Sequence, residues 1–296
     1  MAHTACLAVA HKTKNEVSSM RYVRFTHHNR PVLGVRTSEG VRIVGEETLE
    51  SLLERGVDLE SYGSKAQGPL VEIGEQDYLP LMSKPGKIIC VGLNYADHTK
   101  ESPYAQPDYP TLFPRFNSSL TAHNKPLIRP RISDTLDYEG EMAVVLKSGG
   151  RHITKEQALN HVAGYALFNE GSVREYQFKS PQWTVGKNFD DTGAFGPDLV
   201  TADELPAGGK GLLLQTRVNG KIVQSANTKD MLFDVATIIS TLSEAVTLEA
   251  GDVIVSGTPA GVGFGMDPKV YLKAGDLVEV SIEGIGTLVN PVVDEA

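Results

Sequence analysis

Short runs of β-branched and aromatic residues, each bounded by Gly, Pro, Asn or Ser, recur along the chain and constrain its fold more than any other feature. Runs of this length between turn-forming residues are typical of β-strands. They lie at residues 22–25, 31–35, 41–44, 87–92, 141–146, 162–168, 212–218, 253–256 and 277–282. The first three are close enough in sequence to form a small antiparallel unit. The pattern predicts an α+β protein dominated by β structure.

Helical signals are fewer. Residues 47–53 suit a short helix, and residues 154–157 match a capping box that opens another helix. Asp230 is placed to cap the longest helix, whose apolar residues recur at helical spacing over residues 232–246. The Asn-Gly pair at residues 219–220 predicts a type I′ hairpin turn, because both residues tolerate positive φ.

The chain divides into two predicted domains. A polar stretch punctuated by Gly and Pro resembles a linker and places the boundary near Ser83. We predict a small N-terminal domain over residues 20–83 and a larger one over residues 84–296, with residues 1–19 as a disordered tail or extension. Residues 94–114 are polar and Pro-rich without a hydrophobic period, which predicts a functional lid or a disordered loop.

Charge and composition exclude several classes of protein. The 28 Lys and Arg residues face 37 Asp and Glu residues, a formal net charge of −9, and no basic stripe supplies the field that nucleic-acid binding needs. No apolar stretch approaches the roughly 20 residues that span a bilayer. Cys6 and Cys90 offer no disulfide framework, and the N-terminal apolar patch is too short for a secretory signal. We expect a cytoplasmic protein without nucleic-acid or membrane partners.

An acidic strand over residues 137–145 carries the first candidate site. Because side chains alternate along a strand, Glu139 and Glu141 share one face with Cβ atoms about 7 Å apart, and Asp137 is next along it. Carboxylates so close repel unless they are solvated, protonated or bound to a cation. Carboxylate oxygens favour Mg²⁺, Mn²⁺ or Ca²⁺ over Zn²⁺. A solvated edge strand explains the spacing equally well.

A third carboxylate, Glu170, ends an apolar strand and would complete an octahedral site. Arg174 follows four residues later, and Gln177 three residues after that. The spacing suggests a metal-bound anion held by the guanidinium, since Arg grips a carboxylate through two parallel hydrogen bonds. An ordinary helical ion pair between Glu170 and Arg174 is the alternative.

Two further motifs offer acid–base or oxyanion chemistry. Lys187 follows an apolar run, from which it can reach a developing oxyanion, although a solvated surface lysine is the more common case. His98 and Glu101 share a helix face at i, i+3, so the carboxylate can orient the imidazole and the pair can draw a proton from water. A surface pair without function is the alternative for these two residues.

A Gly-rich segment, residues 256–263, follows a strand and presents backbone N–H groups that little side-chain bulk hides. An anion can dock there, or the glycines allow a tight crossing of the chain. The chain has no G-x-S-x-G, G-x-x-x-x-G-K-[ST], G-x-G-x-x-G or H-E-x-x-H motif. Serine hydrolases, P-loop proteins and Rossmann proteins are therefore disfavoured.

Taken in order, these pieces resemble the fumarylacetoacetate hydrolase superfamily, specifically its acylpyruvate hydrolase-like members, over residues 87–292. The matching pieces are Gly92-Leu93-Asn94-Tyr95, His98-x-x-Glu101, Glu139-x-Glu141, Gly164-Tyr165 to Gln177, Gly186-Lys187 and the segment 256–263. The resemblance implies a mixed β-sheet roll of that superfamily's C-terminal type, a small β-rich N-terminal domain and a homodimer.

The resemblance also implies a ligand set and residue roles. It implies Mg²⁺ or Mn²⁺, with Ca²⁺ as a substitute in crystals, held by Glu139, Glu141 and Glu170. It implies catalytic roles for His98, Glu101 and Lys187, and substrate contacts for Arg174, Gln177 and Thr258. Two positions depart from the family pattern: Glu170 stands where most relatives carry Asp, and Arg115 replaces the usual Lys before a Ser-Ser segment. The role of Arg115 stays open.

The implied reaction is hydrolysis of the carbon–carbon bond of a 2,4-dioxo acid, giving pyruvate or an analogous enolate product plus a carboxylic acid. The substrate would be an acylpyruvate of aromatic compound catabolism, such as fumarylpyruvate or maleylpyruvate, or a fumarylacetoacetate-like acid. His98 and Glu101 would activate water, while the metal and Lys187 stabilise the enolate.

Three other functions stay open. They are decarboxylation of oxaloacetate-type acids, isomerisation of hydroxymuconate-type dienes at the same metal-enolate site, and a non-catalytic metal module that binds diacids. Tyr104, Tyr109 and Phe116 are candidates for an aromatic wall around the distal end of the substrate, or equally for loop packing.

Overall fold

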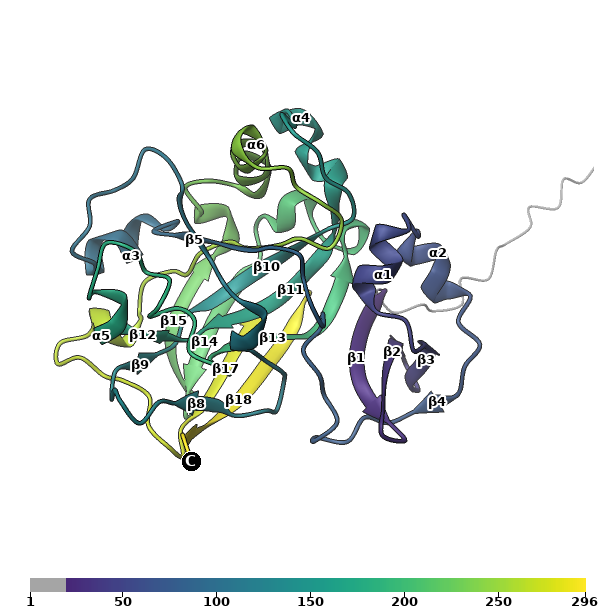
Figure 1. Cartoon of the computed structure of the whole chain (residues 1–296), viewed down its shortest axis with the longest axis horizontal. Coiled ribbons are helices and arrows are strands. Elements are labelled where there is room, and N and C mark those ends of the chain that lie inside the picture. Colours follow the sequence, from purple (N-terminus) through teal and green to yellow (C-terminus); the bar gives the residue numbers. More distant parts are fainter. Residues whose placement is uncertain (1–19) are drawn as a thin grey trace, which may run out of the picture.

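The computed structural model describes residues 20–296, so the predicted tail over residues 1–19, including Cys6, lies outside the described residues. Two large sheets dominate this part of the chain and the helices are short, which confirms the β-dominated α+β class (Figure 1). Within residues 20–296, no helix combines the length and the apolar character needed to cross a membrane.

The larger sheet has eleven strands and mixes parallel with antiparallel pairs. Its order is β4-β3-β2-β1-β13-β11-β10-β16-β5-β6, with β7 beside β13. The strands are β1 (Arg21–His27), β2 (Arg30–Thr37), β3 (Gly40–Gly45), β4 (Leu70–Val71), β5 (Ile88–Gly92), β6 (Thr111–Pro114), β7 (Leu120–Thr121), β10 (Gly140–Leu146), β11 (Val162–Glu170), β13 (Gly193–Thr201) and β16 (Val253–Val255). The seven predicted runs that fall in this sheet all form strands. β13 was not predicted, because Gly193, Gly196 and Pro197 interrupt its apolar pattern.

The N-terminal strands form the predicted antiparallel unit, but they also continue into the larger sheet. β1 pairs with β2 on one side and with β13 on the other, where Val23 lies opposite Asp198. Helices α1 (Leu49–Glu54) and α2 (Leu59–Ser64) pack over this unit at the right of Figure 1. The domain boundary near Ser83 stays a prediction.

The second sheet has five strands in the order β15-β14-β17-β18-β8. They are β8 (Leu127–Arg129), β14 (Leu213–Val218), β15 (Lys221–Asn227), β17 (Leu277–Ile282) and β18 (Gly286–Asp294), and β9 (Leu136–Asp137) pairs separately with β12 (Ser172–Val173). Asn219 and Gly220 join β14 to β15 with φ of 52° and 77°, as the predicted type I′ turn requires. Leu214, Val280 and Leu288 of this sheet share one buried core with Met142 and Val144 of β10.

The remaining helices are α3 (Ala96–Glu101), α4 (Lys155–Ala158), α5 (Arg174–Gln177) and α6 (Val235–Ala245), with 3₁₀ turns η1 (Asn117–Ser119), η2 (Leu159–His161), η3 (Ala202–Glu204), η4 (Ala207–Gly209), η5 (Thr228–Asp230) and η6 (Gly263–Gly265). The prediction that Asp230 caps the longest helix is wrong. α6 begins later, and Asp234 caps it by accepting a hydrogen bond from the Thr237 amide. The Thr154 side chain makes no cap hydrogen bond at α4.

Residues 94–114, predicted as a lid or a disordered loop, contain regular secondary structure. It holds α3 and then β6, which pairs antiparallel with β5. The strand escapes the sequence pattern because it is only four residues long and contains Pro114.

Candidate active site

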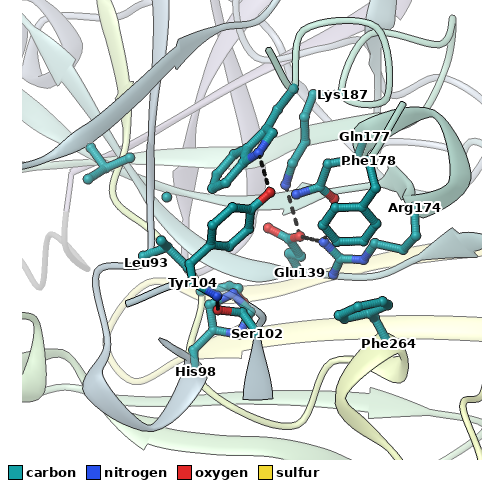
Figure 2. A pocket seen from close by; sticks show the side chains of 14 residues that line it. Leu93, His98, Ser102, Tyr104, Glu139, Arg174, Gln177, Phe178, Lys187 and Phe264 are labelled. Atoms are coloured by element: carbon teal, nitrogen blue, oxygen red, sulfur yellow. Dashed lines mark hydrogen bonds and ion pairs between the residues drawn. The ribbon is translucent and has the colours of Figure 1, made fainter. Parts of the chain in front are cut away.

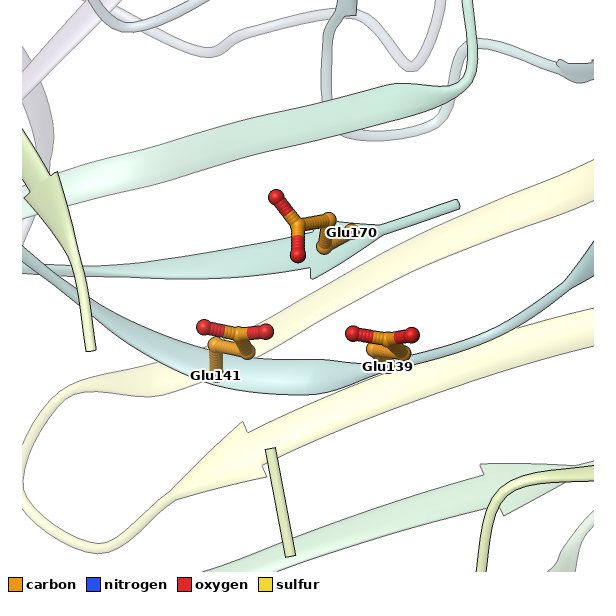
Figure 3. A group of neighbouring side chains, drawn as sticks. All are labelled: Glu139, Glu141 and Glu170. Atoms are coloured by element: carbon orange, nitrogen blue, oxygen red, sulfur yellow. The ribbon is translucent and has the colours of Figure 1, made fainter. Parts of the chain in front are cut away.

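Three glutamates meet where β10 and β11 lie side by side. Glu139 directly precedes β10 and Glu141 lies within it, so the strand period puts both on one face. The Glu170 amide at the end of β11 donates to the Glu139 carbonyl at 2.8 Å, which brings its side chain over the same face. Each carboxylate offers an oxygen within 4.8 Å of the others (Figure 3). We call Glu139, Glu141 and Glu170 the acidic triad.

The acidic triad is buried, so it is not a solvated edge strand. Glu141 and Glu170 lie in β10 and β11, whose residues are all buried, and Glu139 just before β10 is buried as well. Burial and the charges of Glu170 and Glu139 raise the pKa of Glu141 well above its usual value. Burial alone would also raise the pKa of Glu139, but Lys187 and Arg174 lower it below its usual range. The two neighbouring carboxylates therefore have opposite shifts.

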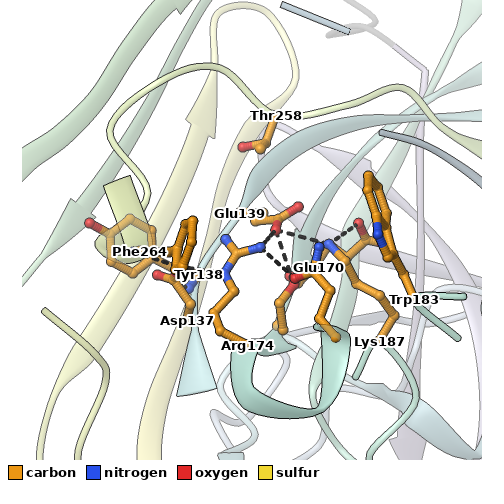
Figure 4. A network of polar contacts seen from close by, with 12 residues as sticks. Asp137, Tyr138, Glu139, Glu170, Arg174, Trp183, Lys187, Thr258 and Phe264 are labelled. Atoms are coloured by element: carbon orange, nitrogen blue, oxygen red, sulfur yellow. Dashed lines mark hydrogen bonds and ion pairs between the residues drawn. The ribbon is translucent and has the colours of Figure 1, made fainter. Parts of the chain in front are cut away.

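Two cationic side chains, Arg174 and Lys187, contact the acidic triad at Glu139 and Glu170 (Figure 4). Lys187 is only 2% exposed, so the surface interpretation of this lysine is wrong. Its Nζ donates to Glu139 Oε1 at 2.8 Å and to Glu170 Oε2 at 3.0 Å. Burial favours the neutral amine, but the charges of Glu139 and Glu170 outweigh it and raise the pKa of Lys187. Arg174 Nη1 lies 2.6 Å from Glu139 Oε1.

The acidic triad fits a hard divalent cation. It presents carboxylate oxygens, the donor type that Mg²⁺ and Mn²⁺ prefer, close together and shielded from water. Glu170 Oε1 is buried and finds no hydrogen-bond partner within residues 20–296. A buried acceptor of this kind is costly unless something satisfies it, and a cation between the carboxylates would do so.

Arg174 does not form the helical ion pair with Glu170. Its Nε donates to Asp137 Oδ2 and its Nη1 to Gln177 Oε1, at 2.8 and 2.9 Å. Its Nη2 is buried and has no hydrogen-bond partner among the described residues. Asp137 therefore anchors Arg174 instead of extending the acidic triad, and Arg174 retains one donor for an anionic ligand.

The Gly-rich segment over residues 256–263 binds carboxylates of the chain itself. Gly257 donates to Glu141, and Gly261 donates to both oxygens of Glu101 at 3.0 and 2.9 Å. The two glycines have φ of 105° and 103°, a conformation that other residues rarely adopt. The Gly257 and Gly261 amides are bonded to side chains of the chain itself, and they are not free to bind an anion. Thr258, in the same segment, donates to the Gly140 carbonyl at 3.0 Å.

His98 and Glu101 both lie on α3, as predicted, but they are not hydrogen-bonded. His98 Nδ1 lies 3.8 Å from Glu101 Oε2, and this nitrogen is buried without a hydrogen-bond partner in the described part of the chain. The Glu101 carboxylate is instead held by the Gly261 amide. His98 faces the pocket in Figure 2.

One pocket joins most of the predicted site residues (Figure 2). Its polar lining includes His98, Glu139, Arg174, Gln177, Lys187 and Thr258. Tyr104 contributes to an aromatic wall and accepts a hydrogen bond from Trp183 Nε1 at 3.0 Å. Phe178 and Phe264 complete the wall. Tyr109 and Phe116 are 56% and 52% exposed and lie outside this lining.

Sequence reasoning missed several supporting residues. Gln224 donates to Thr258 Oγ1 and accepts from the Gly140 amide, at 2.8 and 3.0 Å. Ser172 donates to Glu139 Oε1 at 3.1 Å. Trp183 packs at the pocket wall, so close to Gly92 that a Cβ there would lie 2.3 Å from the indole. Trp183 is the single tryptophan of the chain, which could have marked it as a candidate site residue. A lone Gln or Ser carries no such signal in the sequence.

Comparisons with known proteins agree with this geometry. A family model described as the fumarylacetoacetate hydrolase C-terminal domain matches residues 87–293. A Rattus norvegicus protein named oxaloacetate tautomerase Fahd2a, mitochondrial, is 38% identical over 289 residues, which cover 93% of this chain and 92% of the relative.

Two solved structures are similar over nearly the whole chain. The fumarylacetoacetate hydrolase of Exiguobacterium antarcticum is 40% identical with a TM-score of 0.82, covering 94% of this chain and 100% of its own. The maleylpyruvate hydrolase of Sphingobium sp. SYK-6, solved with manganese(II) and pyruvate, is 25% identical with a TM-score of 0.77, again covering 94% and 100%.

Proposed function

Because the chain belongs to the fumarylacetoacetate hydrolase family, we propose that it is a divalent-metal-dependent enzyme that interconverts the keto and enol forms of oxaloacetate. The relative named oxaloacetate tautomerase, similar over nearly its full length, supports this proposal. This relative favours enolate chemistry at the metal site over carbon–carbon hydrolysis. The sequence had left enolate chemistry open as an alternative. The same acidic triad serves both reactions, so the metal assignment does not depend on this choice.

The observation that carries the proposal is the position of His98. Its imidazole lines the pocket with a buried Nδ1 that has no hydrogen-bond partner in the described chain, and Glu101 is bonded elsewhere. An imidazole in this state can exchange a proton with bound substrate without an aimed water molecule. Tautomerisation needs only such an exchange, whereas hydrolysis needs a positioned water.

The other pocket residues suit a small 2-oxo diacid. Arg174 Nη2 and the Gln177 side chain are placed to bind a substrate carboxylate. A bound divalent cation would supply Lewis-acid polarisation of the 2-oxo group and so acidify the C3 hydrogens. His98 removes a proton from C3, and Lys187, whose raised pKa keeps it protonated, donates one to the C2 oxygen. Exchange with solvent restores both groups, and no atom is gained or lost.

Hydrolysis of a 2,4-dioxo acid is the second candidate. The observation that favours it is the placement of Glu101 next to His98 on α3, because a 3.8 Å separation closes to a hydrogen bond with a small side-chain movement. The manganese-bound maleylpyruvate hydrolase supports the same reaction class.

One experiment separates the candidates. The Mn²⁺-loaded protein is mixed with enol oxaloacetate, with keto oxaloacetate and with a panel of acylpyruvates, while the enol absorbance, pyruvate and carbon dioxide are followed. Accelerated keto–enol exchange without pyruvate or carbon dioxide release supports the proposal. Pyruvate and a carboxylic acid from an acylpyruvate, without faster exchange of oxaloacetate, would overturn it in favour of hydrolysis. Carbon dioxide and pyruvate from oxaloacetate would indicate a decarboxylase.

A further inference from the structure

Arg115 is a buried cation that the proposed chemistry does not use. It follows β6 and is 3% exposed. Each of its nitrogens has a different protein acceptor. Nε donates to Ser119 Oγ at 3.0 Å, Nη1 to the Gly171 carbonyl at 3.2 Å, and Nη2 to Thr192 Oγ1 at 2.7 Å.

These bonds connect the two strand ends beside the acidic triad. Gly171 directly follows Glu170 at the end of β11, and Thr192 directly precedes β13. The Gly171 amide also donates to the Thr192 carbonyl at 3.0 Å. The guanidinium therefore fixes the backbone that carries Glu170. Its Nη1 lies 3.8 Å from Glu170 Oε1, the buried oxygen that has no hydrogen-bond partner in residues 20–296.

The neighbouring backbone is shaped for a guanidinium. A Cβ at Gly193 would lie 2.5 Å from Arg115 Nε and 2.9 Å from its Cζ. Gly193 lies opposite Glu170 in the pairing of β11 with β13. Because Gly193 has no side chain, the guanidinium can occupy this space, with Nη1 3.8 Å from the Glu170 carboxylate.

We propose that Arg115 is a positioning residue that sets the orientation of Glu170 toward the divalent cation. A planar guanidinium can bind three separate acceptors in fixed directions, whereas a lysine amine presents a single nitrogen. Arg115 and Glu170, the two positions where the resemblance implies other residues, lie 3.8 Å apart. The inference rests on the metal site of the proposed function and not on which reaction the site performs.

Two possible roles of Arg115, positioning Glu170 and balancing charge, predict opposite changes in cation affinity when Arg115 is replaced. Removing a positive charge beside three carboxylates should by itself strengthen cation binding, because it removes a repulsion. Loss of positioning should weaken binding, because Glu170 is no longer held as a ligand. Substitutions that keep or remove the charge therefore distinguish the two roles.

The test measures Mn²⁺ affinity by calorimetry on the full-length protein after chelation, for wild type, Arg115→Lys and Arg115→Met. We expect both variants to bind Mn²⁺ roughly tenfold more weakly. The electron paramagnetic resonance spectrum of bound Mn²⁺ should change, and water relaxivity should show an additional coordinated water. Arg151→Lys is the matched control, because the Arg151 guanidinium also binds backbone carbonyls, those of Ser243 and Glu244, outside the pocket. Its affinity should equal that of wild type.

A milder variant keeps the test valid if the Arg115 variants do not fold. Ser119→Ala removes the Nε acceptor, together with the hydrogen bond that Ser119 donates to the Phe116 carbonyl, and should weaken Mn²⁺ binding about threefold. In a Glu170→Ala background, Ser119→Ala should have no further effect, because the two residues act through one ligand. Unchanged or tighter binding in Arg115→Met or Ser119→Ala would overturn the inference. A Glu139→Gln variant that binds Mn²⁺ normally would instead overturn the metal site itself.

Discussion

Two buried clusters of charge in this molecule differ in their balance. At the pocket, Asp137 and the acidic triad supply four carboxylates against three cations, Arg115, Arg174 and Lys187. Across β1, Arg36 of β2 pairs with Asp198 of β13, with Nε to oxygen distances of 2.6 and 2.8 Å, and its Nη2 donates to the Tyr78 hydroxyl at 3.4 Å. In this pair each charge is balanced by the other, and the pair links β2 of the N-terminal unit to β13. The pocket cluster has one carboxylate more than it has cations. Burial and this excess raise the pKa of Glu141, and a bound cation would balance the excess.

The largest expected effect tests that excess directly. Glu139→Gln and Glu141→Gln should each lower metal-dependent turnover on the order of 10³-fold, because each removes a negative ligand from the cation. Turnover of oxaloacetate and Mn²⁺ calorimetry measure the two losses. Asp198→Asn is the control at the balanced cluster and should leave Mn²⁺ affinity unchanged. Normal rates in both Glu variants would refute the ligand assignment.

The next largest effect tests which pocket residue exchanges the proton. His98→Ala should slow oxaloacetate tautomerisation about 10²-fold to 10³-fold, since it removes the group that exchanges the proton. Glu101→Gln should cost about tenfold at most, because Glu101 bonds to Gly261 and not to His98. Stopped-flow enol absorbance gives both rates. Equal, large losses of tautomerisation rate in the two variants would favour the water-activating pair expected of a hydrolase. So would a His98→Ala variant whose acylpyruvate hydrolysis slows far more than its enolate formation.

A third variant breaks the balanced cluster. Arg36→Met should lower the free energy of unfolding by about 2–3 kcal/mol, because it removes the guanidinium that hydrogen-bonds to the buried Asp198. Urea unfolding measures the loss. Arg30→Met removes an exposed ion pair with Glu46 and should change stability little. If the two variants are equally stable, the junction pair contributes no more than a surface pair.

The smallest effect is a pH dependence beside the balanced cluster. Burial, with a contribution from Arg36, lowers the pKa of His123 from 6.5 to about 4. Between those values the unfolded chain binds a proton that the folded chain does not, so stability is full above pH 6.5 and is lost as pH falls toward 4. We expect this residue to contribute about 1–2 kcal/mol of that loss, after solvent screening.

His123→Asn tests this contribution, because an amide oxygen can still accept the hydrogen bond that Val289 donates to His123 Nδ1. The free energy of unfolding is measured in urea at pH 7 and pH 4.5 for wild type and variant. The variant should lose less stability between the two pH values. An identical pH dependence would mean that His123 titrates normally in the folded protein.

The sequence predicted elements that depend on local patterns. Strand runs, the Asn-Gly turn and the shared face of Glu139 and Glu141 follow from strand period and turn chemistry, and the structure has all three. The cap at Asp230 failed because an adjacent acceptor, Asp234, competes for the same role. β13 was missed because glycine and proline mask a strand that tertiary pairing stabilises.

The site was predictable as a set of residues but not as a set of contacts. Glu139, Arg174 and Lys187 meet in one pocket as the resemblance implied, although their roles stay proposals. The backbone amides that bind Asp137 and Glu101 come from residues 261–264, more than 100 residues away, and no local pattern encodes such pairings. For the same reason the guanidinium of Arg115 could be placed only once β11 and β13 were seen together.

The backbone between Gly257 and Phe264 binds three carboxylates at once. Its amides bind Glu141 of the acidic triad, Glu101 of α3, and Asp137, which anchors Arg174. An outward movement of α3 would have to break the bonds between Glu101 and Gly261. The same segment, residues 257–264, also bonds to the proposed metal ligand Glu141 and to Asp137, which holds Arg174. Opening of the pocket is therefore coupled to the positions of Glu141 and Arg174. A substitution that makes residues 257–264 more rigid should slow the exchange of both metal and substrate.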